Sequence, residues 1–259
     1  MVEPLRTILE RFTAEPLPDD CFHDRCQKLL RTDENAAIVR ERNPNWYDPW
    51  ALPVWCECEQ EQQVVTKDLR AGANLPNEHE PKTFENFDKE RSGLWSAVDA
   101  ATKIAAGEHP WILTLSGSVG TGKSHLAEAV ARSYLDHGMS VRHEFVPDLC
   151  RQMREASGPR SDESADLLLA PAFAAELLWL DDLGMEKGSD FTAERLTNLV
   201  QDRVTRNGLL IVTTNRTRDE MREGFGGAYF RLATRLYDIH TGTVRVVTIE
   251  AKDYRVEGA

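Results

Sequence analysis

The stretch Gly117-Ser118-Val119-Gly120-Thr121-Gly122-Lys123-Ser124 decides the fold of this chain. It has the complete spacing of a Walker A loop, in which glycines let backbone N–H groups turn inward and cradle phosphate oxygens. The helix expected to follow it adds its positive N-terminal end. We expect residues 117–124 to bind the phosphates of ATP, with Lys123 at the β- and γ-phosphates and the Ser124 hydroxyl on Mg²⁺.

Strands and helices are expected to alternate on both sides of this loop. Leu177–Leu180 is an unbroken apolar run, which is typical of a strand buried on both faces of a parallel sheet. The alternation predicts an α/β fold in which helices cover both faces of a parallel sheet. The expected strands are Trp111–Leu115, Ser140–Val146, Leu177–Leu180, Leu209–Thr214 and Thr243–Glu250, and the expected helices are Ser124–His137, Pro147–Glu155, Phe191–Arg206 and Tyr229–Tyr237.

A second element of a nucleotide site follows the apolar strand Leu177–Leu180. The carboxylates of Asp181 and Asp182 stand at its end, as in a Walker B element. We expect Asp181 to hold Mg²⁺ through water and Asp182 to orient or deprotonate the attacking water. Many ATPases place Glu at the second position, and Asp is one methylene shorter. Hydrolysis is therefore expected to be slow or to depend on a partner.

Composition excludes some classes of protein. The chain has 259 residues and a formal net charge of −12, which argues against nonspecific coating of nucleic acid but leaves a local basic groove open. No apolar run approaches the ~20 residues of a membrane span, and residues 1–12 lack the apolar core of a signal peptide. We expect a cytoplasmic protein with no membrane partner. Its cysteines are then thiols or metal ligands, and Cys150 is expected to be a small buried residue.

Candidate zinc ligands gather before the α/β region. Four thiolates around Zn²⁺ would stabilise a segment too short to bury a sufficient apolar core. The spacing departs from the C-x₂-C pattern of zinc knuckles, so His23 in place of one cysteine, and unligated thiols, remain alternatives. The candidate ligands are Cys21, Cys26, Cys56 and Cys58.

Turn-forming residues separate the cysteine segment from the α/β region. Ala71-Gly72-Ala73-Asn74-Leu75-Pro76-Asn77, continuing to Pro81, has the composition of a linker. We therefore divide the chain into an N-terminal module at 1–70, with the zinc site and a surface for partner docking, a linker at 71–82 and an ATPase core at 83–259.

With these residues identified, the chain resembles the AAA+ ATPases of the DnaC/DnaI helicase-loader and IstB transposition-helper group. The resemblance extends from about Thr83 to Arg255, and it rests on the order and spacing of short motifs more than on any one of them. These motifs are Thr83-Phe84-Glu85-Asn86-Phe87, Gly122-Lys123-Ser124-His125-Leu126-Ala127, Val146-Pro147-Asp148-Leu149, Leu180-Asp181-Asp182-Leu183-Gly184, Thr213-Thr214-Asn215, Thr234-Arg235-Leu236 and Asp253-Tyr254-Arg255.

The resemblance implies roles for further residues. Asn215 matches the sensor-1 residue that contacts the γ-phosphate or the water, although it also suits a helix cap. Arg235 matches the arginine finger that enters the ATP site of a neighbouring subunit, with Arg231 as its rival. Arg255 resembles a C-terminal arginine sensor of the nucleotide. His125 belongs to the loop signature; we include it with the nucleotide-binding residues and expect its ring on the solvent side of the helix.

The resemblance also implies a function. A loader would bind ATP–Mg²⁺, single-stranded DNA and a replicative hexameric helicase, and would form a homo-oligomer when ATP is bound. With one strand expected after Arg235, there is no room for the C-terminal helical lid of many AAA+ proteins. An IstB-type transposition helper and an ATP-binding switch with little hydrolysis remain alternatives, and a small-molecule P-loop kinase fits the motifs poorly. The cysteine segment favours the loader.

Overall fold

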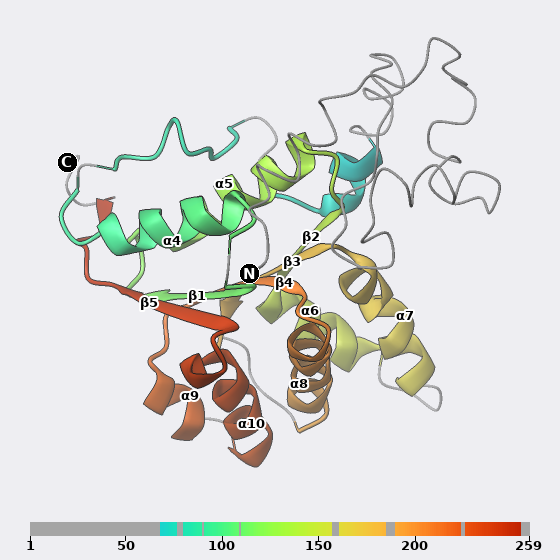
Figure 1. The fold of residues 1–259 in the computed structure, drawn as a ribbon. Helices are drawn as coiled ribbons and strands as arrows, with labels where there is room; N and C mark the ends of the chain where they lie inside the picture. Colours follow the sequence, from blue (N-terminus) through green and yellow to red (C-terminus); the bar gives the residue numbers. More distant parts are fainter. Residues whose placement is uncertain are drawn as a thin grey trace, which may run out of the picture.

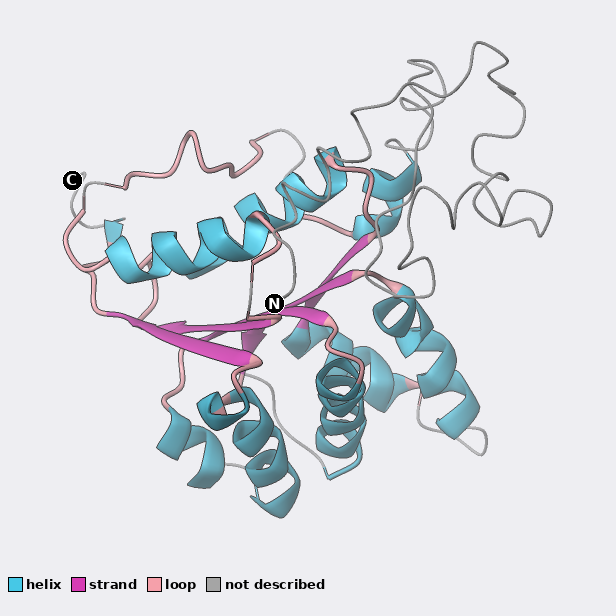
Figure 2. Ribbon diagram, viewed as in Figure 1, coloured by secondary structure: helices cyan, strands magenta, loops and turns pink. Residues whose placement is uncertain are grey.

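The core is a five-stranded sheet in the order β2-β3-β4-β1-β5, in which every pair of neighbouring strands is parallel. The computed structural model describes residues 68–76, 80–89, 91–108, 110–156, 161–184, 190–223 and 226–254. The strands cross the middle of the molecule as one twisted layer (Figure 2). Their bounds are β1 Ile112–Gly117, β2 Val141–Phe145, β3 Leu177–Leu183, β4 Leu209–Thr214 and β5 Val244–Ile249.

Helices cover both faces of this sheet (Figure 1). Alternate residues of the strands enter two apolar clusters on opposite faces; Leu113 and Leu115 belong to one and Ile112 to the other. This alternation follows from the two-residue period of a strand. The first face carries α4 Trp95–Ala105 and α5 Lys123–Asp136. The second carries α6 Val146–Glu155, α7 Ser161–Ala174, α8 Asp190–Thr205, α9 Arg218–Glu223 and α10 Gly226–Leu236.

The fold class expected from the sequence is confirmed. Each expected strand is present, and its ends lie within three residues of the expected ones. Helices α4, α7 and α9 have no counterpart in the sequence prediction. Helix α7 contains Pro171 in its interior, a residue that usually ends a helix, and its apolar residues do not fall on one clear face.

A short helical segment precedes the core. Residues 68–73 are helical and lie beside β2 and the end of α5, where Figure 1 draws them in cyan. The Ala73 side chain is fully buried in the first apolar cluster, and Leu69 and Leu75 pack against it. Residues 71–76 thus touch the core, while the division of the chain into module, linker and core stays a prediction.

Two sequence expectations concern metals and membranes. Cys21, His23, Cys26, Cys56 and Cys58 lie outside the described residues, and within those residues no group of three or more His, Cys, Asp or Glu side chains could hold a metal ion. No helix in the described ranges is long and apolar enough to span a membrane.

Candidate nucleotide-binding site

The loop between β1 and α5 adopts backbone conformations that favour glycine. Gly122 precedes α5 with a φ of 99°, and a Cβ there would lie 2.9 Å from the ring of Phe87. Gly120 has a φ of 73°, and a Cβ there would lie 1.8 Å from the Asp253 carboxylate. Larger side chains would therefore be strained and would meet neighbouring atoms. The expected Walker A spacing thus has a steric basis in the fold.

Lys123 directs its amine back into this loop. The residue is 7% exposed, and its Nζ donates hydrogen bonds to the carbonyls of Gly117, at 2.9 Å, and Ser118, at 2.6 Å. Ser118 O also accepts a hydrogen bond from the Thr121 hydroxyl. The loop therefore holds one positive charge next to the N-terminus of α5. Backbone N–H groups, a helix N-terminus and a fixed ammonium are the donor set that phosphates require, so these residues fit a nucleoside triphosphate.

Ser124 and Asp181 are brought together by the fold. The Ser124 hydroxyl donates to Asp181 Oδ1 at 2.9 Å, and the Thr213 hydroxyl on β4 donates to the same oxygen. Burial alone would raise the pKa of the Asp181 carboxyl, but the neighbouring His143 ring and the hydrogen bonds from Thr213 and Ser124 outweigh it and lower the pKa. An ionised carboxylate beside a hydroxyl is an oxygen set that suits Mg²⁺.

Asp182 is placed by an irregularity in the sheet. The register between β3 and β4 shifts between Leu180 and Leu183, and Asp182 has a φ of 59°. A bulge of this kind turns side chains out of the strand, and Asp is one of the residues that tolerate this conformation. The Asp182 N–H donates to Thr213 Oγ1 at 2.9 Å. Its carboxylate accepts a 2.7 Å hydrogen bond from the Asn215 amide, so the fold brings Asp182 and Asn215 together.

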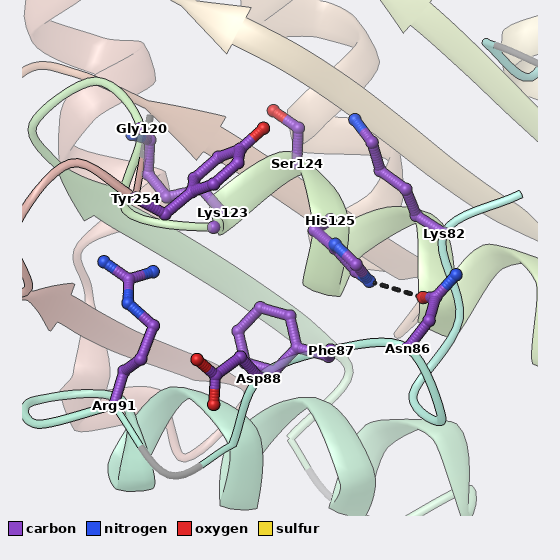
Figure 3. A pocket seen from close by; sticks show the side chains of 11 residues that line it. Lys82, Asn86, Phe87, Asp88, Arg91, Gly120, Lys123, Ser124, His125 and Tyr254 are labelled. Atoms are coloured by element: carbon purple, nitrogen blue, oxygen red, sulfur yellow. Dashed lines mark hydrogen bonds between the residues drawn. The ribbon is translucent and has the colours of Figure 1, made fainter. Parts of the chain in front are cut away.

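A pocket of about 440 Å³ adjoins the loop (Figure 3). Its walls come from the loop and the start of α5, from residues 82–91, and from Tyr254 near the C-terminus. Phe87 is 8% exposed, and its ring packs edge-on against His125 with centroids 4.9 Å apart. The pocket thus combines an aromatic ring with polar groups, as sites for small ligands commonly do.

The expectation that His125 faces solvent is wrong. Its Nε2 lies 3.0 Å from Thr83 O and 2.9 Å from Asn86 Oδ1, and the ring points to Asn86 in Figure 3. Both partners are acceptors, so Nε2 carries the hydrogen. Burial is the main cause that lowers the pKa of His125, and the ring is therefore neutral near pH 7. Residues 83–86 fold back over α5, and the hydrogen bonds of His125 hold them there as part of the pocket wall.

The C-terminal segment also reaches the loop. Tyr254 N donates to Gly120 O at 3.1 Å, and the guanidinium of Arg91 lies 6.0 Å from the centre of the Tyr254 ring. Arg91 also donates a hydrogen bond to Lys252 O. Arg255, the expected arginine sensor, lies outside the described residues.

Two expected residues stand apart from this site, and one expectation about the core is confirmed. Arg231 and Arg235 are exposed on α10, which packs on the other face of the sheet from α5. Cys150 is fully buried, as expected.

Sequence reasoning missed the roles of Thr213, which binds both aspartates, and of Asn86 and Phe87 in the pocket, although all three stand inside motifs that it quoted. It also missed His143, whose place near Asp181 has no signal in the sequence.

The parallel sheet, the Gly-rich loop and the acidic pair define a P-loop ATP-binding protein of AAA+ architecture. More narrowly, the chain belongs to the family of IstB-like ATP binding proteins, whose family model matches residues 58–258.

Relatives of two kinds are similar to parts of this chain. The replicative helicase loader DnaC of Buchnera aphidicola subsp. Schizaphis graminum is 30% identical over 123 residues, which are 47% of this chain and 50% of that protein. A Mycobacterium tuberculosis protein, named as an ATP-binding protein in an insertion sequence, is 30% identical over 139 residues, 52% of this chain and 53% of that protein. The chain spans about half the length of the curated relatives it matches.

A solved structure supports the architecture. The AMPPCP-bound DnaA from Aquifex aeolicus superposes with a TM-score of 0.56 at 22% identity, covering 69% of this chain and 54% of that one. At this identity the likeness shows the fold alone.

Proposed function

We propose that this protein is a cytoplasmic ATPase that loads a replicative hexameric helicase onto single-stranded DNA. The observation that carries the ATPase part is the linked set Ser124–Asp181–Thr213–Asp182–Asn215 beside the Lys123 loop. These side chains come from three different parts of the chain and converge at the carboxyl ends of parallel strands, where ligands of open α/β sheets bind.

Each residue of the set has a proposed role. Lys123 meets the β- and γ-phosphates, and Ser124 and Asp181 hold Mg²⁺. Bound magnesium would neutralise charge on the phosphates. Asp182, fixed by the Asn215 amide, orients the attacking water and accepts its proton. The shorter Asp at this position is consistent with slow hydrolysis that a partner stimulates.

The remaining residues of the expected site take proposed places around the nucleotide. The pocket of Asn86, Phe87, Arg91 and Tyr254 would hold the nucleoside, with residues 117–124 on the phosphates. His125 would act through Asn86. Arg255 would be the C-terminal arginine sensor.

Assembly completes the proposed site. Arg235, or Arg231 as its alternative, would reach the ATP of a neighbouring subunit in a homo-oligomer. Both arginines are exposed, an accessibility that a residue acting on another subunit needs.

The names of the relatives support two kinds of partner. DnaC is named as a replicative helicase loader, and the M. tuberculosis protein belongs to an insertion sequence. We favour the loader because the cysteine segment, with Cys21, Cys26, Cys56 and Cys58 as proposed zinc ligands, suits a module that grips a helicase. The alternative is a transposition helper of the IstB type.

A partner assay separates these two functions. The purified protein is mixed with the replicative helicase or the transposase of its own host, with ATP, and loading of the helicase on single-stranded DNA is measured by strand unwinding. The loader predicts ATP-dependent loading by wild type and none by Lys123→Ala. Binding of the transposase with no loading of the helicase would establish the alternative.

A further inference from the structure

The segment that precedes the core makes a reciprocal contact with strand β2. The Asn74 amide donates to His143 O at 3.1 Å, and His143 Nδ1 lies 2.9 Å from Asn74 O. A backbone carbonyl only accepts hydrogen bonds, so Nδ1 carries the hydrogen. β2 is an edge strand, and Asn74 therefore bonds to backbone that β3 leaves available.

The other side of the His143 ring faces the proposed magnesium ligand. His143 is 6% exposed, and its ring packs on Trp179 with centroids 4.2 Å apart. Its Nε2 lies 3.9 Å from Asp181 Oδ2 and, within the described part of the chain, has no hydrogen-bond partner. Ser124 and Thr213 hold Oδ1 of the same carboxylate. The imidazole therefore lies beside Oδ2, the carboxylate oxygen that the two hydroxyls do not contact.

Within the described residues, the contacts that hold residues 68–76 on the core, besides those of Asn74, are a small set that includes the packing of Leu69 and Leu75 and a 3.4 Å bond from Arg132 to Pro76 O. Ala73 is buried, but the ion pair Arg70–Asp136 joins two largely exposed side chains, and such pairs contribute little to stability. The bond from Arg142 to Gly72 O, at 3.3 Å, is exposed as well. A segment with few buried contacts opens at lower free energy than the sheet it covers.

We propose that His143 is a positioning residue that couples residues 68–76 to the Asp181 carboxylate, so that displacement of this segment weakens magnesium-dependent ATP binding. The Asn74 contacts set the position of the ring, and the ring bounds the carboxylate. Linkage makes the effect reciprocal, so ATP–Mg²⁺ also holds residues 68–76 on the core. The inference rests on the proposed place of Asp181 in the ATP site. Through this coupling, a partner that binds the chain before residue 68 and displaces residues 68–76 would change the affinity for ATP.

Two substitutions separate the parts of this connection. Asn74 has a φ of 55°, which glycine adopts without strain, so Asn74→Gly removes the amide and keeps the backbone. His143→Asn places an amide nitrogen near the position of Nδ1, which keeps the bond to Asn74 O but ends short of Asp181. Asn207→Gly is the matched control, because Asn207 has a φ of 53° in an exposed turn after α8.

The first measurement is the equilibrium affinity of a fluorescent non-hydrolysable ATP analogue, with Mg²⁺ and with EDTA. We expect Asn74→Gly and His143→Asn each to weaken binding in Mg²⁺ by about threefold to tenfold, which lies within the range of mutations along coupled networks. In EDTA both should bind as wild type does. The double variant should be no weaker than His143→Asn alone, and Asn207→Gly should match wild type.

The second measurement is hydrogen exchange of the backbone amides of residues 68–76. ATP analogue with Mg²⁺ should slow it in wild type and in Asn207→Gly, and leave it unchanged in His143→Asn. If that variant does not fold, His143→Gln takes its place, because its amide nitrogen lies near the position of Nε2 and loses the bond to Asn74 O.

The outcomes separate this inference from the proposed function. If Lys123→Ala abolishes nucleotide binding but Asn74→Gly and His143→Asn bind in Mg²⁺ as wild type does, the coupling is wrong and the ATP site stands. If the affinity losses of the two single variants multiply in the double variant, the coupling is also wrong. If wild type shows no magnesium-dependent binding of ATP, the proposed site is wrong and the coupling falls with it.

Discussion

Replacing Thr213 by Val tests whether one buried hydroxyl holds the acidic pair in place. Thr213 is 1% exposed; its hydroxyl donates to Asp181 Oδ1 and accepts from the Asp182 N–H. Valine has nearly the same shape without the hydroxyl, so the substitution isolates these two hydrogen bonds. Thr213→Ser is the matched control, because it keeps the hydroxyl and loses a methyl group.

The magnitude follows from the two bonds. A hydrogen bond to a charged acceptor contributes about 1.5–3 kcal/mol, and a buried N–H left without an acceptor costs about 1–3 kcal/mol. The two are not additive, since the Asp181 side chain is 14% exposed and water can replace part of what is lost. We expect the free energy of unfolding of Thr213→Val to lie about 2–4 kcal/mol below that of Thr213→Ser. This is a large part of the ~5–15 kcal/mol of a typical domain.

The difference should depend on pH. The pKa of Asp181 is lowered in the folded protein, so its carboxylate stabilises the fold above the unfolded pKa, and this contribution is lost as pH falls through the folded pKa. Thr213 is one cause of the lower pKa. The gap between the two variants should therefore be full near pH 7 and shrink below about pH 4.

Urea unfolding of the nucleotide-free variants, followed by circular dichroism at pH 7 and below about pH 4, measures the difference between their free energies of unfolding. A Thr213→Val protein within about 0.5 kcal/mol of Thr213→Ser at pH 7 would refute the reasoning, because that is the ordinary effect of a surface substitution.

Three further predictions concern catalysis, assembly and metal. Asp182→Asn should bind ATP like wild type but lose turnover, because Asn tolerates the positive φ of 59° while the base is gone; undiminished hydrolysis would show that another residue handles the water. Mixing Arg235→Ala with Lys123→Ala chains should restore part of the turnover, since one interface then pairs an intact loop with an intact finger; no rescue, where wild type oligomerises, removes the trans model. Purified protein should carry about one zinc ion per chain by metal analysis, and loss of Cys56 and Cys58 together should remove it but spare ATP binding; a metal-free wild type prepared without chelators counts against the site.

Local sequence determined the phosphate loop and the order of strands and helices. A Walker A loop depends on residues within eight positions of each other, and its glycines are required by φ values such as the 99° at Gly122. Buried strands are recognisable because the part of a strand that is covered on both faces is apolar, as in residues 177–180 of β3 and 209–212 of β4. The acidic pair was predictable because Asp181 and Asp182 come directly after the apolar run of β3.

Helices α4 and α7 depended on tertiary structure. Each is stabilised by packing one side against the sheet, and in α7 this overrides the unfavourable Pro171. Helix α4 has Leu94 at its N-cap and no side-chain cap, and α7 lacks a clear apolar face.

Contacts between distant residues decided the detailed site. His125 turns to Thr83 and Asn86 because that segment folds back over α5, although its position on the helix alone suggested solvent. The Asn215–Asp182 bond spans 33 positions, and the resemblance, which implied a γ-phosphate or water contact for Asn215, did not include it. His143 reaches Asp181 only because β2 and β3 pair in one register. The position of one histidine in a sequence does not show which residues it contacts in the fold. Spacing fixes chemistry within one loop, while pairing of strands fixes which side chains meet across the sheet.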